Sequence, residues 1–197
     1  MNGLAQLIED CGSYGVMEAE YYDKMIHRIP PLKIVEREKW LVDQCRDKRV
    51  INYGCASGKL HEVLKLAAKE LYGVDKVKGD WFVLDCDDLG IAELPSPEVD
   101  LIVCGEFLEH LRNPGFFLDR LVKQKTPVLV TVPNAFSAVS RYWVNTRKIE
   151  CVNAGHYCYY SYRTIRHLLE SSGFEIAETA WYNGRPRFSE GLVVRTK

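Results

Sequence analysis

Two carboxylates and an imidazole lie close together in the segment Glu106-Phe107-Leu108-Glu109-His110. If this segment is helical, Glu106, Glu109 and His110 occupy positions i, i+3 and i+4 and share one face. Such a group binds a divalent metal ion or exchanges protons with a reacting hydroxyl. The plain alternative is a solvated first helical turn, with its acids at the helix N-terminus. His156 follows in an irregular stretch rich in tyrosine, where a structural histidine packed on aromatic rings is the plain alternative.

A glycine-bounded segment, Gly54-Cys55-Ala56-Ser57-Gly58, follows an apolar stretch and opens a helical pattern. Glycines there let the backbone approach a ligand closely, and a helix N-terminus offers free N–H groups. The segment lacks the GK[ST] ending of a phosphate loop and the G-x-G-x-x-G of a dinucleotide fold. Its position after a predicted strand therefore supports a binding site more strongly than its sequence pattern does.

Acidic residues also end the next two apolar stretches. Asp75 ends one, and a carboxylate there can accept both hydroxyls of a ribose, although a turn aspartate is the plain alternative. Asp85 and Cys86 end the other, where the plain alternative is a helix N-cap. Both positions belong to the same edge of a sheet if the strands run parallel.

The elements that would position these residues alternate between strand and helix from residue 49 onward. Strands are predicted at 50–53, 71–74, 81–84, 100–104, 127–132, 174–181 and 192–195, and helices at 59–70, 114–124 and 161–173. Residues 134–156 show no clear period. Continuous apolar strands alternating with helices indicate a mostly parallel sheet that is covered on both faces, with its ligand beyond the carboxyl ends of the strands.

Residues 1–48 carry helical patterns only, the last of them over about 34–45. We therefore predict an N-terminal helical cap over 1–48, of which residues 1–31 cover the substrate side, and a core domain over 49–197. The length of the chain fits this division, because 197 residues are enough for one domain with an extension.

Composition excludes several classes of protein. The net charge is −1, which argues against a protein that coats nucleic acid. No apolar run approaches the length of a membrane span, and the N-terminus lacks a secretion signal. The seven cysteines form no C-x-x-C pair and several stand in apolar runs, so we expect reduced thiols and a cytoplasmic protein.

Taken in order, these segments resemble the class I S-adenosylmethionine (SAM)-dependent methyltransferases, over about residues 49–196. The block from Glu106 to Pro114 is the most specific. The other carrying segments are Val50–Gly58, Gly73–Asp75, Asp85–Leu89, Val99–Gly105, Val130–Asn134, and His156 with Ser161–Ile165. The resemblance implies a Rossmann-like, doubly wound seven-stranded sheet of order 3-2-1-4-5-7-6.

The resemblance also implies roles in cofactor binding. Gly54, Cys55, Ala56, Ser57 and Gly58 would line the methionine moiety of SAM. Asp75 would hold the ribose hydroxyls, and Asp85 with Cys86 would flank the adenine. Asn52 and Glu106 complete the set of cofactor-binding residues that it predicts.

Three departures from the family pattern stand out. An acid is usual where Asn52 stands, and a glycine where Ala56 stands. Only nine residues separate Asp75 from Asp85, which is too few for a crossover helix of the usual length. We therefore expect the second crossover helix to be missing or reduced to a turn, with the third strand frayed, displaced or not parallel.

The favoured function is methyl transfer to an oxygen of a small molecule or sugar, with His110 and His156 as candidate bases. A second version of this chemistry uses a divalent metal. Glu106, Glu109, His110 and His156 resemble the metal ligands of ubiquinone-pathway O-methyltransferases and of small-RNA 3′-end ribose methyltransferases; we favour the version without the metal.

Two other classes of function remain open. A non-catalytic binding protein on a degraded methyltransferase fold is the main alternative, because of Asn52, Ala56 and the missing crossover. Nucleic-acid modification, through Arg141, Arg147 and Lys148, is disfavoured by the neutral charge. We expect a small-molecule acceptor and no membrane partner.

Overall fold

A single mixed sheet forms the centre of the protein. The computed structural model describes residues 33–55, 58–77, 81–88, 90, 93–147, 155–184 and 188–197. Eight strands follow the order β1-β7-β8-β6-β5-β2-β3-β4. They are β1 (Lys33–Val35), β2 (Arg49–Tyr53), β3 (Glu70–Asp75), β4 (Phe82–Val83), β5 (Leu101–Gly105), β6 (Val128–Pro133), β7 (Ile176–Tyr182) and β8 (Gly191–Thr196).

The predicted sheet is confirmed, with one strand added at an edge. Without β1, the order of the strands is the predicted 3-2-1-4-5-7-6 read from the other side. Strand β8 runs antiparallel to both β6 and β7, while the other pairs are parallel. The central strands β2, β5 and β6 are buried almost throughout, as continuous apolar runs require when helices cover both faces.

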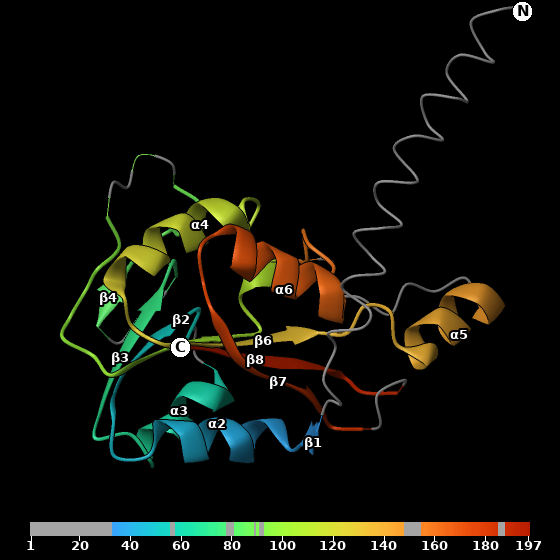
Figure 1. Cartoon of the computed structure of the whole chain (residues 1–197), viewed down its shortest axis with the longest axis horizontal. Helices are drawn as coiled ribbons and strands as arrows, with labels where there is room; N and C mark the ends of the chain where they lie inside the picture. Colours follow the sequence, from blue (N-terminus) through green and yellow to red (C-terminus); the bar gives the residue numbers. More distant parts are fainter. Residues whose placement is uncertain are drawn as a thin grey trace, which may run out of the picture. The chain divides into compact units, whose positions relative to one another are not determined.

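Helices lie on both faces of the sheet (Figure 1). One face carries α2 (Arg37–Cys45) and α3 (Lys59–Lys65), and the other carries α4 (Pro114–Leu121) and α6 (Tyr162–Ser171). The remaining elements are α5 (Ala138–Arg147) and two short 3-10 helices, η1 (Leu108–His110) and η2 (Val122–Gln124). Among the described residues, none of the helices has the length and apolar character that crossing a bilayer requires.

Local signals explain where α4 and α6 begin and end. Asn113 caps α4 by accepting the backbone N–H of Phe116 at 3.3 Å, and Pro114 follows at the first helical position. Ser161 and Thr164 form a capping box at the start of α6. Gly173, with φ +93°, ends that helix as predicted.

The segment before residue 49 takes part in the core. The helix predicted over 34–45 begins only at Arg37, because Lys33–Val35 form strand β1 beside Ala180–Tyr182 of β7. Trp40, Leu41 and Cys45 of α2 pack in the same hydrophobic cluster as strand residues of β2, β5 and β7. The packed core therefore extends before the predicted boundary at 48/49. The helical patterns before residue 33, and with them the predicted covering of the substrate side by residues 1–31, fall outside the described residues.

The shortened crossover is present as predicted. Strand β4 has only two residues, both with exposed side chains, and the described residues between β3 and β4 include no helix. The strand nevertheless runs parallel to β3, with Val74 opposite Phe82 and Asp75 opposite Val83. Strand β4, the third strand of the predicted core, is therefore short, as a frayed strand would be, and it is parallel to its neighbour.

Candidate active site

The first cavity lies beyond the carboxyl ends of β2, β3 and β5 and has a volume of about 370 Å³. Five of the ten residues predicted to bind the cofactor line it, namely Gly54, Asp75, Asp85, Cys86 and Glu106. Other walls come from Val77, Leu84, Phe107, His110 and Leu111. The lining thus mixes carboxylates at the strand ends with apolar side chains, which suits a polar nucleoside with a flat ring.

Gly54 lines this cavity and has a backbone conformation of its own. Its φ of +72° is a conformation that favours glycine, and the Phe107 ring fills the place where a Cβ would stand. The backbone N–H groups of Gly54 and Cys55 both donate to the Val74 carbonyl, at 2.8 and 3.3 Å. These bonds tie the glycine segment to β3.

The other predicted cofactor residues are placed differently. Asn52 is buried, and its amide contacts His61 Nδ1 at 3.2 Å instead of lining the cavity. Cys55 is buried and Gly58 is the N-cap of α3; neither belongs to the lining. Ala56 and Ser57 lie outside the described residues. The roles given to these residues stay predictions.

The residue after β5 turns the chain sharply. Glu106 has φ +51°, an uncommon conformation for a residue with a side chain, and η1 follows it instead of an α-helix. A face shared by Glu106, Glu109 and His110 was expected only if the segment were helical, and the structure does not meet that condition. Strained conformations of this kind persist where the surrounding structure holds them, often at functional sites.

Glu106 is held by three side chains on one oxygen. Thr131 and Tyr182 each donate a hydroxyl hydrogen bond of 2.9 Å to Oε1, and an Arg37 nitrogen lies 3.7 Å from it. Burial raises the pKa of Glu106, while Arg37, Tyr182 and Thr131 act in the opposite direction. These three partners were not predicted, since each comes from a different element and no local pattern in the sequence marks them.

Three of the four candidate metal ligands come together. One ligand atom from each of Glu109, His110 and His156 lies within 4.8 Å of the others. The two imidazole rings meet edge to face, with centroids 4.6 Å apart. Glu106 does not belong to this group. We name Glu109, His110 and His156 the histidine–glutamate cluster.

Glu109 is the buried member of this cluster. Its residue exposure is only 1%, and neither carboxylate oxygen has a hydrogen-bond partner among the described residues. Burial, followed by the nearby charge of Glu106, raises the pKa of Glu109 to about 8. A buried carboxylate without a partner is costly, so a proton or a cation must satisfy it.

The backbone sets the tautomer of His110. Its Nδ1 lies 3.1 Å from the Gly155 carbonyl oxygen, which can only accept a hydrogen bond. In the neutral ring Nδ1 therefore carries the proton, and Nε2 keeps a lone pair for a ligand or a proton. Burial and the nearby His110 lower the pKa of His156, which favours the neutral form of the His156 ring.

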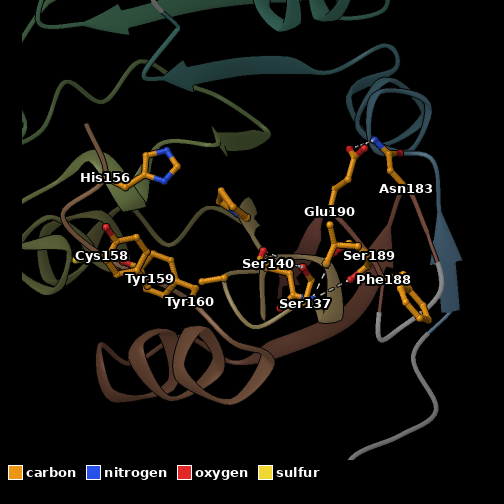
Figure 2. Close-up of a pocket in the computed structure, with 14 residues that line it drawn as sticks. Ser137, Ser140, His156, Cys158, Tyr159, Tyr160, Asn183, Phe188, Ser189 and Glu190 are labelled. Atoms are coloured by element: carbon orange, nitrogen blue, oxygen red, sulfur yellow. Dashed lines mark hydrogen bonds between the residues drawn. The ribbon is translucent and has the colours of Figure 1, made fainter. Parts of the chain in front are cut away.

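A second cavity of about 380 Å³ adjoins the cluster (Figure 2). His156 lies at one end of the group that lines it, and Asn183, Phe188 and Glu190 lie at the other. Ser137 and Ser140 line it between these ends, with their hydroxyl oxygens 2.9 Å apart. Among these residues only His156 was predicted, because the others belong to α5, to the residue before it and to the β7–β8 connection.

Comparison with known proteins identifies the family. The family model described as "Methyltransferase domain" matches residues 19–179. The chain belongs to this family. With the fold described above, it is a member of the class I SAM-dependent methyltransferase superfamily, as the sequence predicted.

Curated relatives of this methyltransferase include two ubiquinone biosynthesis O-methyltransferases, from Bordetella pertussis and Bordetella parapertussis. Each is 26% identical over a match of 126 residues, and the coverage is 52% of this chain and 50% of the relative. The chain thus spans about half the length of the curated relatives it matches.

Solved structures show the same fold. The small RNA methyltransferase HEN1 superposes with a TM-score of 0.64 at 14% identity, over 82% of this chain and 25% of that one. The N-methyltransferase NodS from Bradyrhizobium japonicum gives a TM-score of 0.55 at 20% identity, over 81% and 84%. At these identities the likeness concerns the fold alone.

Proposed function

We propose that this protein transfers the methyl group of SAM to a hydroxyl of a small molecule. One observation carries the proposal: the histidine–glutamate cluster joins the two cavities. His110 lines the first cavity and His156 lines the second, and the two rings are in contact. SAM bound in the first cavity would present its methyl group next to an acceptor in the second.

The residues of the chain would have two roles in this reaction, which are to bind the reactants and to accept a proton. The methyl group of a sulfonium is already activated, so the protein has mainly to align the acceptor oxygen with it and to exclude water. The hydroxyl loses its proton as it attacks. His110 Nε2 and the His156 ring are the groups placed to receive that proton.

A divalent cation fits the same residues. The oxygens of Glu109, which have no hydrogen-bond partner among the described residues, form together with two imidazoles a donor set that suits such an ion. When bound by Glu109, His110 and His156, a cation would lower the pKa of an acceptor hydroxyl. This observation gives the metal version of the reaction more support than the sequence alone did.

Binding comes first among the tests. Calorimetry with SAM and S-adenosylhomocysteine (SAH) is expected to give micromolar affinities. If neither binds at millimolar concentration, the non-catalytic alternative replaces the enzyme.

The acceptor class is tested with methyl-labelled SAM. We expect transfer to catechols, phenols or sugars, and none to the matched deoxy compounds, with and without added Mg²⁺ or Mn²⁺. A short RNA with a free 3′ end serves as a separate arm. Transfer only to amines, or only to the RNA, would contradict the proposal.

A further inference from the structure

The wall of the first cavity that follows β4, where the adenine is expected, has no crossover helix beside it among the described residues between β3 and β4. Strand β4 is two residues long, and the exposed fractions of Phe82 and Val83 are 44% and 61%. The segment that follows it supplies Leu84, Asp85, Cys86 and Asp87 to the cavity wall. Some other feature must hold this wall in place.

The carboxylate of Asp87 bonds this wall to the opposite one. Its Oδ1 accepts the backbone N–H groups of Arg112 and Asn113 at 2.9 and 3.3 Å, and its Oδ2 accepts that of Arg112 at 3.1 Å. Leu111, the residue before Arg112, lines the same cavity. The wall after β4 and the wall after η1 are thus joined by one side chain.

Both ends of this connection are themselves fixed. The Asp87 N–H donates to Asp85 Oδ1 at 3.0 Å, which orders the turn next to the cavity. On the other side, Asn113 caps α4, and the Arg112 guanidinium lies 5.5 Å from the centre of the Tyr157 ring. Hydrogen bonds to a charged group are stronger than neutral ones, and the carboxylate of Asp87 accepts two backbone N–H groups, one of them shared between its two oxygens.

We propose that Asp87 is a positioning residue for the cofactor, which takes over the support that the missing crossover helix would give to the adenine wall. This inference rests on the proposed binding of SAM in the first cavity. Asp87 acts through the backbone of Arg112 and Asn113 and through the turn at Asp85.

The test compares Asp87→Ala with Asp88→Ala. The side chain of Asp88 is a matched control, since it is exposed and accepts only the local N–H of Gly90 at 2.8 Å among the bonds given for it. We expect Asp87→Ala to weaken SAH binding on the order of tenfold and to raise KM for SAM, while kcat at saturating SAM is kept. Asp88→Ala should match the wild type.

Two further measurements exclude a merely structural role. Asp87→Asn keeps an acceptor for the Arg112 and Asn113 N–H groups, so its SAH affinity should lie between those of the wild type and Asp87→Ala. Hydrogen exchange at the Arg112 and Asn113 amides should be faster in Asp87→Ala at a temperature where the variant is folded.

The outcomes separate this inference from the proposed function. If the wild type binds SAH but Asp87→Ala binds it equally well, the inference alone is overturned. An equal loss in Asp88→Ala, or a loss of kcat with KM unchanged, also overturns it. If the wild type binds neither SAM nor SAH, the proposed function fails and takes the inference with it.

Discussion

The rings of His110 and His156 touch edge to face, with 4.6 Å between their centroids, although each lines a different cavity. This contact makes the two histidines the connection between the proposed cofactor site and the proposed acceptor site. It arises because η1 follows β5 directly, while the loop before α6 returns over it through the bonds from Tyr157 and Cys158 N–H to the Glu109 carbonyl.

His156→Asn is expected to lower kcat by about 10²–10⁴-fold, the usual contribution of a general acid or base. The affinity for SAH should not change, because His156 lines only the second cavity. The measurement is methyl transfer to the best acceptor of the panel, alongside calorimetry. His167→Asn, an exposed histidine on α6, is the matched control. Unchanged kcat in His156→Asn would refute the role.

Glu109→Gln is expected to weaken Mn²⁺ binding by about tenfold or more, since a carboxylate ligand becomes a neutral amide. Direct titration with the metal measures this without any turnover. Glu93→Gln changes an exposed acid outside the cluster and should bind Mn²⁺ as the wild type does. If the wild type binds no divalent ion, and chelators leave methyl transfer intact, the metal version of the reaction is wrong.

Asp75→Ala is expected to weaken SAH binding by about 1.5–3 kcal/mol, the range for hydrogen bonds to a charged group. Its Oδ1 already accepts the Val77 N–H at 3.0 Å, and Asp75 lines the first cavity, so the carboxylate is held at the cavity wall. Calorimetry with SAH measures the change, and Asp119→Ala on α4 is the control. Equal affinities would show that the ribose is bound elsewhere.

The positions of the strands were predictable from the sequence because buried parallel strands are continuous apolar runs that end at turn residues, whereas their order came from the resemblance to the methyltransferase superfamily. Strand β1 was not, since three residues within a helical pattern carry no signal without the β7 edge beside them. Helix α5 was also missed: its sequence, AVSRYWVNTR, has its apolar residues in two short blocks, and no clear period was found in residues 134–156.

The candidate site was predictable in its residue types and not in its geometry. Strand ends indicate which residues approach the ligand, and Gly54, Asp75 and Asp85 do line the first cavity. Whether Glu106 joins Glu109 and His110 depends on a single backbone angle, its φ of +51°. That angle follows from Thr131, Tyr182 and Arg37, which reach Glu106 only in the folded chain.

Leu41→Ala tests whether α2 belongs to the core. Leu41 is fully buried in the cluster that also contains Val50, Leu101 and Val103. Removing a buried leucine side chain is expected to cost about 2–5 kcal/mol in the free energy of unfolding. Urea denaturation measures it, with the exposed Leu66→Ala as the control. A loss below about 1 kcal/mol would mean that α2 packs loosely.

The pair formed by Arg49 and Asp100 should make the free energy of unfolding depend on pH in the acid range. Hydrogen bonds from the Arg49 side chain and backbone hold the pKa of Asp100 at about 2. The unfolded value is about 3.9, so the native state favours the charged form. The stabilisation is therefore complete above about pH 4 and is lost as the pH falls from there toward about 2.

Asp100→Asn isolates this contribution. The wild type should be more stable than the variant at pH 7, and the difference in urea midpoint should shrink between about pH 4 and pH 2. Asp119→Asn on α4 is the control, and a difference that does not change with pH would contradict the assignment.

The N–H of Asp100 donates to the Arg49 carbonyl at 2.9 Å, where β2 and β5 begin. Since both cavities lie beyond the opposite, carboxyl ends of the strands, kcat at pH 7 should be the same in Asp100→Asn and the wild type.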